Sequence, residues 1–571
     1  MVSQWRWKQK LTGIGLGIGA LLPLALPGAA AESVTVAYGP IERSIQLEEL
    51  EALANEGVLS NDLKIYADYL NLEAEDIAQI RQALNQPADL DVVTIDRFLH
   101  TRQGEYLLNI LADVIRTAGR RQDLRALRGP LILSAADGPE GLTLLNVLRN
   151  FPTSTVRVDL AKGFAIAREL DRTVLQTSAA LDYINREANR QADERPLTND
   201  DKAAISRATQ PGPYPIERTA LRRNTPLPVD IYAPVSVTGQ PLTERPAVVI
   251  SHGLGYDETV FRYLAEHLAS HGFVALAVEH RGSSAAQINA LLTGRSAMVV
   301  PDNEFTERPQ QITALLDDLE AQTNWQQLID FNRIGILGQS FGGYTALSLA
   351  GADLNFERLE TACPPGTLSL NISLLLQCQA LDLRTANQQQ LDLSDRRVRA
   401  AIAINPITSV LFGEASLNQV RRPTLILAGG ADTVAPALAE QIYPYTWLTT
   451  PDRYLMVMPL GTHFSVSAMS DTGSEAFALP PEFIGQQPDI DQAYVAATGL
   501  AFFDSYLSDS PQYRALLSSA GTLALSQQLS QQTIPLWLLQ TLSADTLRAS
   551  FNQTPPPVET DLGPNPLLRP E

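Results

Sequence analysis

The feature that most constrains the fold is an alternation, after about residue 215, between short apolar runs and segments with helical periodicity. Runs such as AVVIS at 247–251, VALAV at 274–278 and TLILAG at 424–429 contain almost no polar residues. A strand that is buried on both faces has this pattern, whereas a strand with one solvent-exposed face alternates polar and apolar residues. Residues 215–510 are therefore predicted to form an α/β fold, with a mostly parallel, doubly wound sheet covered by helices on both faces.

The rest of the 571-residue chain has other patterns on each side of this region. Residues 32–185 have helical spacing apart from one extended stretch, STVRVDL at 154–160, and are predicted to form a mainly helical N-terminal domain. Residues 186–214 are charged and then rich in Pro and Gly, which is typical of a linker. Residues 511–571 are predicted to form a helical extension that ends in a proline-rich tail.

Residues 1–31 have the pattern of a secretory signal peptide. Basic residues precede an apolar run over 11–26, and small residues then lead to a cleavage site after Ala31. A retained membrane anchor is the alternative, but the run is short for a bilayer span, and Pro23 and Pro27 interrupt it. We therefore predict export to the periplasm or the extracellular space, with no integral membrane span left after cleavage.

Charge and cysteine content argue against several functions. The net charge is −20 and no block rich in Lys or Arg stands out, so the sequence gives no support for nucleic-acid binding. The two cysteines, Cys363 and Cys378, are predicted to form one disulfide in an exported protein, with two buried free thiols as the alternative. The sequence has no Cys-x-x-Cys pair, which argues against a zinc or redox site.

Residues 338–342, GQSFG, have the Gly-x-Ser-x-Gly pattern of a nucleophile elbow. The pattern alone is weak, but an apolar strand precedes it and a helical segment of small residues follows, as the elbow requires. A side chain at Gly338 or Gly342 would collide with neighbouring elements, and a helix N-terminus favours negative charge developing near Ser340. The alternative is a tight turn with an idle serine. We predict that Ser340 is a nucleophile.

A serine nucleophile needs a base and a carboxylate that orients the base. Among six histidines, His463 lies in the loop after the last strand, the late position that the chain order Ser, Asp, His requires. Asp432 follows the strand at 424–429 and is predicted to orient His463; alternatively, it only caps the next helix. His267 and His271 are four residues apart on a helix, but no acidic third ligand is evident, so neither a metal nor a cofactor is predicted.

The charge that forms on the substrate carbonyl oxygen needs backbone N–H donors. Phe341, the residue after the nucleophile, is predicted to supply one of them. We assign the second donor to Leu254, in the glycine-rich loop HGLG at 252–255 that follows the strand at 247–251. A plain glycine-rich turn is the alternative for this loop.

Together these residues resemble the α/β-hydrolase superfamily. The segments SHGLG at 251–255, AVEHRGSSAA at 277–286 and GQSFGG at 338–343 further resemble the platelet-activating-factor acetylhydrolases, which release short or oxidised acyl groups from phospholipids without a metal. The resemblance covers about residues 215–510. It implies an oxyanion N–H from the Leu254 position.

The chain departs from the acetylhydrolases at the acid. In those enzymes the acid follows the strand after the nucleophile helix, where this chain has Asn405 in AIAINPI. The acid then lies one strand later, at Asp432, as in dienelactone-hydrolase-like, cutinase-like and polyester-hydrolase-like members. The triplet EHR at 279–281 is a hallmark of the acetylhydrolases, and residues 32–160 are similar to a helical domain of unknown function that precedes some bacterial hydrolases.

The sequence therefore predicts a secreted serine hydrolase of carboxylic esters, a lipase or esterase that works through an acyl-enzyme. The substrate is expected to be a small-molecule or lipid ester, and the acetylhydrolase resemblance implies phospholipid acyl esters. Alternatives are a dienelactone- or polyester-hydrolase-like enzyme, a peptidase, and a non-catalytic binding protein on the same fold. Residues 353–396 are too long for a simple connection and are predicted to form either a cap over the site or a surface excursion held by the disulfide.

Overall fold

The computed structural model describes residues 31–38, 41–69, 72–88, 92–117, 124–137, 141–364, 369, 371–383, 391–468, 484–485 and 487–551. The predicted signal peptide, apart from Ala31, and the predicted proline-rich tail lie outside these residues. The chain divides into two compact units, which are described separately. The first comprises the described parts of residues 1–90 and 115–158, and the second comprises those of residues 91–114 and 159–571.

The first unit combines a small sheet with helices. Its four strands lie in the order β2-β1-β4-β3, and the β1–β2 and β3–β4 pairs are antiparallel. The strands are β1 Ser33–Tyr38, β2 Ile41–Gln46, β3 Ile115–Thr117 and β4 Thr155–Asp159. The helices are α1 Leu47–Glu56, α2 Asn61–Tyr69, α3 Ala74–Asn85, α6 Leu124–Ala136 and α7 Leu144–Arg149. The predicted extended stretch is β4, whereas β1, β2 and β3 were not predicted; β2 runs directly into α1, and β3 directly follows α5.

The boundary of the N-terminal domain differs from the predicted one at 185. The first unit stops at residue 158, and residues 91–114 and 159–185 group with the second unit. The reason is α8, Leu160–Glu194, a single helix of 35 residues that crosses the predicted boundary. Three of its residues at four-residue spacing lie in the core of the second unit: Ala180, Ile184 and Ala188. This spacing gives α8 an apolar stripe that packs against the core.

The second unit contains a nine-stranded sheet in the order β13-β12-β11-β10-β9-β7-β8-β6-β5. Strands from β12 to β8 in this order are parallel, and β13, β6 and β5 are antiparallel to their neighbours. The strands are β5 Ile216–Leu221, β6 Val229–Pro234, β7 Arg245–Ser251, β8 Val274–Val278, β9 Ile329–Gln339, β10 Val398–Ile404, β11 Thr424–Gly429, β12 Arg453–Met458 and β13 Trp537–Leu539. The predicted mostly parallel sheet is confirmed. The C-terminal extension, predicted to be helical, also adds strand β13 to this sheet.

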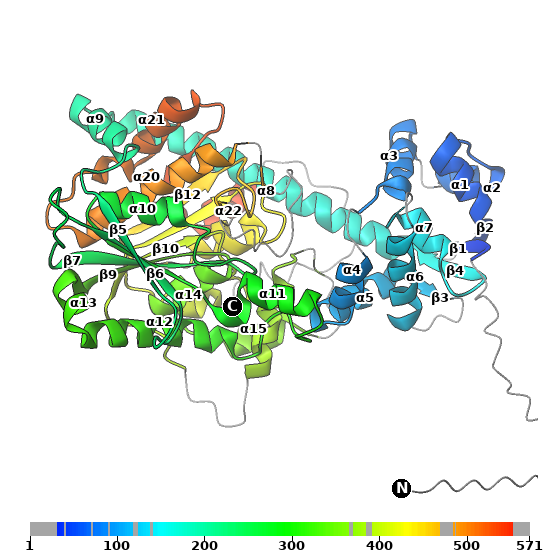
Figure 1. The fold of residues 1–571 in the computed structure, drawn as a ribbon. Helices are drawn as coiled ribbons and strands as arrows, with labels where there is room; N and C mark the ends of the chain where they lie inside the picture. Colours follow the sequence, from blue (N-terminus) through cyan, green and yellow to red (C-terminus); the bar gives the residue numbers. More distant parts are fainter. Residues whose placement is uncertain are drawn as a thin grey trace, which may run out of the picture. The chain divides into compact units, whose positions relative to one another are not determined.

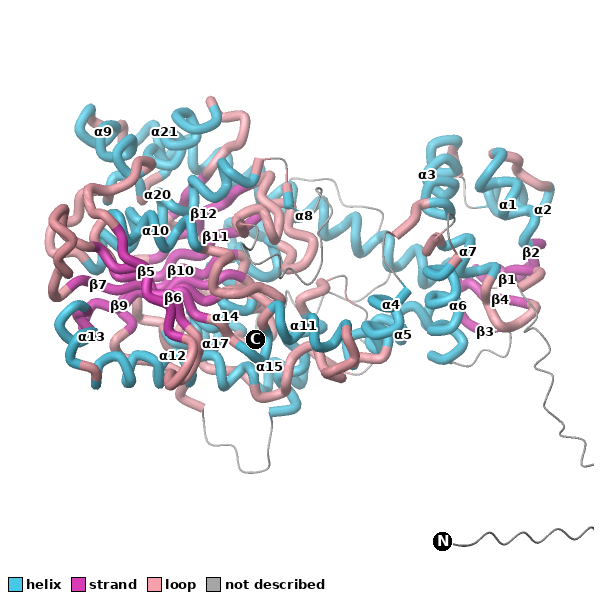
Figure 2. The backbone as a smooth tube through the Cα atoms, viewed as in Figure 1, coloured by secondary structure: helices cyan, strands magenta, loops and turns pink. Residues whose placement is uncertain are grey.

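Helices cover both faces of the sheet, with α10 and α20 on one side and α12 and α14 on the other (Figures 1 and 2). A separate apolar core lies under each helical layer. The helical elements besides α8 are α4 Val92–Leu99, α5 Arg102–Val114, α9 Asn199–Ala208, α10 Arg262–Ser270, η1 Arg281–Ser283, α11 Ala285–Leu292, α12 Glu304–Ala321, α13 Thr323–Leu328, α14 Phe341–Leu349, α15 Phe356–Ala362, α16 Leu374–Gln377, η2 Cys378–Leu383, α17 Gly413–Leu417, η3 Leu438–Ile442, α18 Tyr443–Tyr445, α20 Pro488–Leu507, η4 Arg514–Leu516, α21 Ser519–Ser530 and α22 Ala544–Phe551.

Residues 186–214, predicted as a linker, are helical over most of their length. α8 continues to Glu194, and α9 spans Asn199–Ala208. A capping box begins α9, because the Thr198 hydroxyl accepts from the Asp201 N–H and the Asp201 carboxylate accepts from the Thr198 N–H. The charged residues in this stretch therefore belong to exposed helix faces rather than to an irregular connection.

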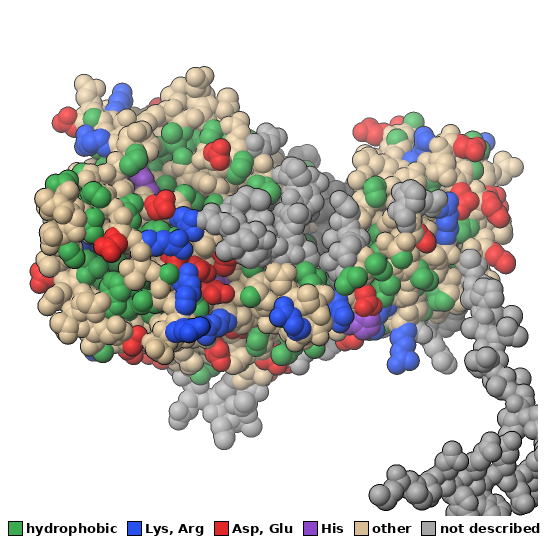
Figure 3. All heavy atoms as spheres, in the orientation of Figure 1, with side chains coloured by type: hydrophobic (Ala, Val, Ile, Leu, Met, Phe, Trp, Pro, Cys, Tyr) green, Lys and Arg blue, Asp and Glu red, His purple; other side chains and the backbone are tan. Residues whose placement is uncertain are grey.

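None of the described helices is both long and apolar enough to cross a membrane. On the face seen in Figure 3, basic side chains lie beside acidic ones. This face therefore does not present an extended patch of a single charge.

Candidate active site

Ser340 lies at a sharp turn between β9 and α14. Its backbone has φ 57° and ψ −115°, a combination that strains a residue with a side chain. The Ser340 N–H donates over 2.8 Å to the carbonyl of Ile404, at the end of β10. A Cβ at Gly338 would lie 1.9 Å from the Gly342 oxygen, and one at Gly342 would lie 2.1 Å from the Ser251 oxygen. The turn therefore has the strand, helix and backbone crowding that its sequence pattern predicted.

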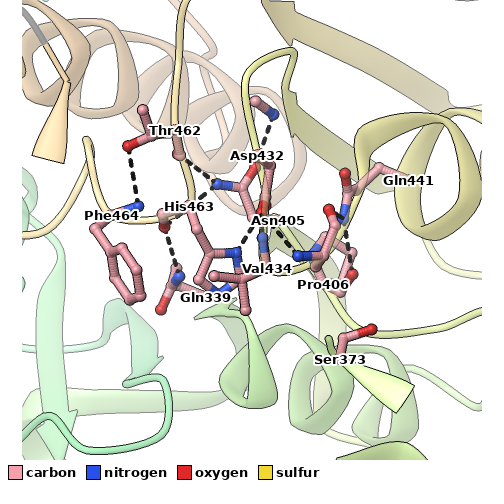
Figure 4. Close-up of polar contacts among 12 residues, drawn as sticks. Gln339, Ser373, Asn405, Pro406, Asp432, Val434, Gln441, Thr462, His463 and Phe464 are labelled. Atoms are coloured by element: carbon pink, nitrogen blue, oxygen red, sulfur yellow. Dashed lines mark hydrogen bonds and ion pairs between the residues drawn. The ribbon is translucent and has the colours of Figure 1, made fainter. Parts of the chain in front are cut away.

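Asp432 and His463 meet beyond the carboxyl ends of β11 and β12 (Figure 4). His463 Nδ1 lies 2.7 Å from Asp432 Oδ2, and both side chains are almost completely buried. The second carboxylate oxygen, Oδ1, accepts hydrogen bonds from the N–H groups of Val434 and Ala435 over 2.9 and 2.8 Å. One oxygen of Asp432 thus holds the turn that follows it, and the other contacts the imidazole; the next helix begins later, at Leu438, so Asp432 is not its N-cap.

Two buried amide side chains hold the loop that carries His463. Gln339, the residue before Ser340, donates from Nε2 to the His463 carbonyl over 2.9 Å. Asn405 donates from Nδ2 to the Thr462 carbonyl over 3.0 Å and accepts from the Gly429 N–H over 2.8 Å. These contacts tie the histidine loop to the ends of β9, β10 and β11.

The sequence pattern alone indicates no role for Gln339 or Asn405. A signal existed for Asn405, because it stands where the acetylhydrolases have their acid and because an amide can donate and accept at once. Its backbone has φ 42°, in the left-handed region that Asn tolerates better than most residues. Gln339 offered no signal, since its partner lies 124 residues away in sequence.

The structure brings the histidine to the acid but does not join it to the serine. Ser340 is 7% exposed, and its hydroxyl makes no hydrogen bond to any residue that the structure describes. Hydrogen bonds between catalytic groups are often long in enzymes without substrate and shorten when the substrate binds.

The two residues predicted as oxyanion donors have N–H groups that are available for a ligand. Leu254 lies in the turn after β7, and Phe341 is the first residue of α14. Within the described part of the chain, neither backbone N–H donates a hydrogen bond. N–H groups in the first turn of a helix lack partners inside the helix and attract negative charge. The Gly255 N–H donates over 2.8 Å to the Ser283 carbonyl, which fixes the far side of Leu254.

Two further histidines at this edge of the sheet are held neutral. His252 and His280 are almost completely buried. Burial, followed by the positive charge of Arg308, lowers the pKa of His252 to about 3 and places that of His280 well below its ordinary value. His252 Nδ1 lies 2.6 Å from the Gly253 carbonyl, and its Nε2 accepts the His280 N–H over 2.9 Å. With both ring nitrogens engaged, His252 is not placed to act as a base.

The pair His267 and His271 has a structural use. Their Nε2 atoms each lie 3.0 Å from a backbone carbonyl, of Ala208 and Gln210 respectively, so the pair fixes the end of α9 against α10. Among the residues that the structure describes, no group of three or more His, Cys, Asp or Glu side chains is arranged to hold a metal ion.

The segment 353–396 contains the predicted disulfide between Cys363 and Cys378, which joins α15 to the start of η2. Part of the segment lies outside the described residues: 365–368, 370 and 384–390. The arrangement of the segment as a cap stays a prediction.

The described part of this segment is attached to the loop after Asp432. The Ser373 N–H donates to the Val434 carbonyl over 2.9 Å. Glu440, which is completely buried, accepts hydrogen bonds from the side chains of Asn371 and Gln377. A buried carboxylate is tolerated when several donors surround it, so this cluster fixes the segment next to the candidate acid.

Comparison with protein families gives two matches, one in each part of the chain. Residues 30–159 match a family described as an alpha/beta hydrolase of unknown function (DUF1400), and this match ends where α8 begins. Residues 224–313 match the family of platelet-activating factor acetylhydrolase, isoform II. The second match contains the Leu254 turn.

Similar proteins include acetylhydrolases, a cutinase and a bis(hydroxyethyl) terephthalate hydrolase. Platelet-activating factor acetylhydrolase from Cavia porcellus is 29% identical over 19% of this chain and 33% of its own length. Cutinase est1 from Thermobifida alba is 24% identical over 47% of this chain and 69% of its own length. Bis(hydroxyethyl) terephthalate hydrolase from Streptomyces coelicolor is 24% identical over 40% of this chain and 53% of its own length. The chain thus spans about a third of the acetylhydrolase relative. The sheet order, the turn at Ser340 and these matches agree that the chain has the α/β-hydrolase fold.

Proposed function

We propose that the protein is a serine hydrolase of carboxylic esters, with Ser340 as nucleophile, His463 as base and Asp432 as the acid that orients the base. The observation that carries the proposal is the buried contact of 2.7 Å between His463 and Asp432. It lies at the same edge of the sheet as the strained turn of Ser340, and the amide of Gln339 links the two loops.

In this proposal, Ser340 Oγ attacks the acyl carbon of the ester while His463 Nε2 takes the hydroxyl proton. The tetrahedral intermediate collapses when His463 returns the proton to the leaving alcohol, and an acyl-enzyme remains. Water then attacks the acyl carbon with His463 again as base, which releases the carboxylic acid and restores the serine. Asp432 keeps the Nδ1–H tautomer in place and stabilises the imidazolium that forms.

The oxyanion of each tetrahedral intermediate is proposed to bind the backbone N–H groups of Leu254 and Phe341. Two observations support this assignment: both N–H groups are free among the described residues, and Phe341 begins a helix. Preorganised donors of this kind contribute strongly because they need no reorientation as charge develops.

We propose an exported enzyme, with residues 1–31 as its signal peptide, that acts on a small or lipid ester. Short-chain phospholipid esters are favoured by the match over residues 224–313. A second candidate is a polyester-type ester such as a hydroxyethyl terephthalate. It is favoured by the position of Asp432 after β11 and by the longer similarity to the Thermobifida cutinase.

Replacement of Ser340 by Ala tests the proposal. We expect the variant to lose p-nitrophenyl butyrate hydrolysis by at least about 10⁴-fold, because the residual rate comes from binding and the oxyanion donors alone. A fluorophosphonate probe should label the wild type at Ser340 and should not label the variant. Full turnover in the variant, or labelling at another residue, contradicts the assignment and favours a different site or a binding protein.

A substrate panel separates the two candidates. It consists of p-nitrophenyl esters of increasing acyl length, a phospholipid with a 2-acetyl group, and bis(hydroxyethyl) terephthalate. An acetylhydrolase-like enzyme should prefer the 2-acetyl phospholipid, whereas a polyester-type enzyme should release terephthalate monoester faster. The Ser340→Ala variant is the blank for each substrate.

A further inference from the structure

A buried arginine connects the two segments that carry the proposed oxyanion donors. Arg308 lies in the first turns of α12 and is completely buried. Its guanidinium carbon lies 4.4 Å from the centre of the Phe341 ring. Its Nη1 donates over 2.9 Å to the carbonyl of His252, two residues before Leu254. One cation thus contacts both sides of the proposed oxyanion site.

Ser283 links Arg308 to the backbone on the other side of Leu254. The Ser283 hydroxyl accepts a hydrogen bond from Arg308 Nε over 2.9 Å and donates to Glu304 Oε1 over 2.6 Å. The Ser283 carbonyl accepts from the Gly255 N–H over 2.8 Å. The backbone is therefore held on both sides of Leu254. The His252 carbonyl bonds to Arg308 directly, and the Gly255 N–H is linked to Arg308 through Ser283.

The charge on Arg308 is the unusual part of this arrangement. Burial lowers the pKa of Arg308 to about 10, with Glu304 acting in the opposite direction, so the side chain remains a cation at neutral pH. His252 and His280, the nearby ionisable rings, stay neutral there because burial and Arg308 itself lower their pKa values. Ion pairs that are fully buried contribute little net stability, so fold stability alone gives a weak reason for a guanidinium at this position.

We propose that Arg308, supported by Ser283, is a positioning residue of the ester hydrolase: it fixes the Leu254 and Phe341 N–H groups relative to each other. Arg308 does not touch the substrate in this role. It acts on the backbone of the Leu254 turn through the His252 carbonyl and on α14 through the Phe341 ring. The inference rests on the proposed function and adds to it a residue that belongs to neither the triad nor the donor pair.

The test compares the variants Arg308→Met and Arg308→Lys with the wild type. For p-nitrophenyl butyrate, we expect Arg308→Met to lower kcat by about 10- to 100-fold, less than loss of a whole donor network, with KM changed by no more than about threefold. Inhibition by a trifluoromethyl ketone, which forms a tetrahedral adduct with an oxyanion, should weaken by the same factor as kcat. Arg308→Lys keeps the charge but not the planar guanidinium, so its kcat should lie between those of the wild type and Arg308→Met.

Arg397→Met is the matched control. Arg397 is also largely buried and ion-paired, but it precedes β10 at the opposite edge of the sheet. This variant should lower the melting temperature while kcat per folded molecule and the inhibition constant of the trifluoromethyl ketone stay at wild-type values. If Arg308→Met behaves in the same way, Arg308 has only a structural role and the inference is wrong.

Ser283→Ala keeps the test decisive if Arg308→Met does not fold, since it removes only one hydroxyl. We expect it to lower kcat and the affinity for the trifluoromethyl ketone together, by about 3- to 10-fold. Wild-type values of both quantities in Ser283→Ala and Arg308→Lys would overturn the inference. Failure of the proposed function is distinguishable, because in that case Ser340→Ala itself would retain turnover.

Discussion

The nine-stranded sheet holds ionisable side chains in different ways at the two ends of its parallel strands, here called the carboxyl edge and the amino edge. At the carboxyl edge, formed by the carboxyl ends of the parallel strands, Asp432 and His463 are almost completely buried. The backbone there is strained as well, with φ of 57° at Ser340 and 42° at Asn405. Buried polar groups and strained backbone both cost stability, and they concentrate where a protein needs fixed geometry for chemistry.

The amino edge, where the same strands begin, has a more ordinary arrangement. Arg397 pairs with Asp395 there and with two carboxylates that remain about half exposed or more, Asp317 and Glu320. A cavity of about 660 Å³ adjoins this cluster. From this contrast we expect substitutions at the carboxyl edge to act mainly on turnover and substitutions at the amino edge to act mainly on stability.

The largest difference in kcat is expected when one buried carboxylate at each edge is replaced by an amide. Asp432→Asn should lower kcat for p-nitrophenyl butyrate by about 10⁴-fold, because an amide no longer selects the His463 tautomer that can accept the serine proton. Asp395→Asn is the matched control, since it also replaces a buried carboxylate by an amide. We expect its kcat to stay at the wild-type value and its melting temperature to fall. A variant Asp432→Asn that keeps more than about a tenth of the wild-type kcat would remove the acid from the mechanism.

Much of the carboxyl edge could be predicted from sequence because its signals are local. The turn at Ser340 needs glycines two residues away on each side, and Asp432 directly follows an apolar strand. Arg308 could not be predicted, because a charged residue in a helix normally indicates a solvent-exposed face. Arg308 is buried by the packing of α12 against α14 and against the segments that carry His252 and Ser283.

Prediction of the fold is limited in the same way, because elements without a local sequence signal were missed. The parallel strands were predictable because each is an apolar run of five residues or more. Strand β13 has three residues, and its role depends on pairing with β12, which is about 80 residues earlier. α8 was divided between a domain and a linker because its last turns are rich in charge, although Ala180 and Ile184 belong to the core. Local composition could not reveal the partners of these segments, and without the partners their structure was predicted only in part.

Removal of the Asn405 side chain should give an intermediate effect at the carboxyl edge. Asn405→Ala leaves the Gly429 N–H and the Thr462 carbonyl without their partner and frees the loop that carries His463. We expect kcat to fall by about 10- to 100-fold and the free energy of unfolding to fall by about 1 to 3 kcal/mol. Chemical unfolding and kcat measured on the same preparation check both values. A loss of stability with an unchanged kcat would show that the base does not depend on Asn405.

The smallest effect on turnover is expected from a third buried carboxylate, that of Asp491, because its substitution should act on stability instead. Asp491 lies near the start of α20, 4% exposed, and its Oδ1 atom has no hydrogen-bond partner among the described residues. Burial raises the pKa of Asp491 to about 6, and a hydrogen bond from Ser465 only partly opposes the shift. The folded protein therefore holds this proton more tightly than the unfolded chain, whose aspartates have pKa values of about 4. The stability that the protonated Asp491 contributes is fully present below about pH 4 and is lost as pH rises through about 6.

Asp491→Asn removes this loss, so at pH 8 the variant should exceed the wild type in free energy of unfolding by about 3 kcal/mol, and the difference should vanish near pH 4. Asp395 should behave in the opposite way. Burial alone would raise the pKa of Asp395, but the hydrogen bonds and charge of Arg397 outweigh burial and place it below the ordinary value. Its contribution is present above the unfolded pKa and is lost as pH falls through the folded one, so Asp395→Asn should be less stable than the wild type at pH 8 and should approach it in acid. Urea unfolding of both variants from pH 2 to 8 measures the two trends, and parallel curves would mean that the fold holds the carboxylates of Asp491 and Asp395 in the same way.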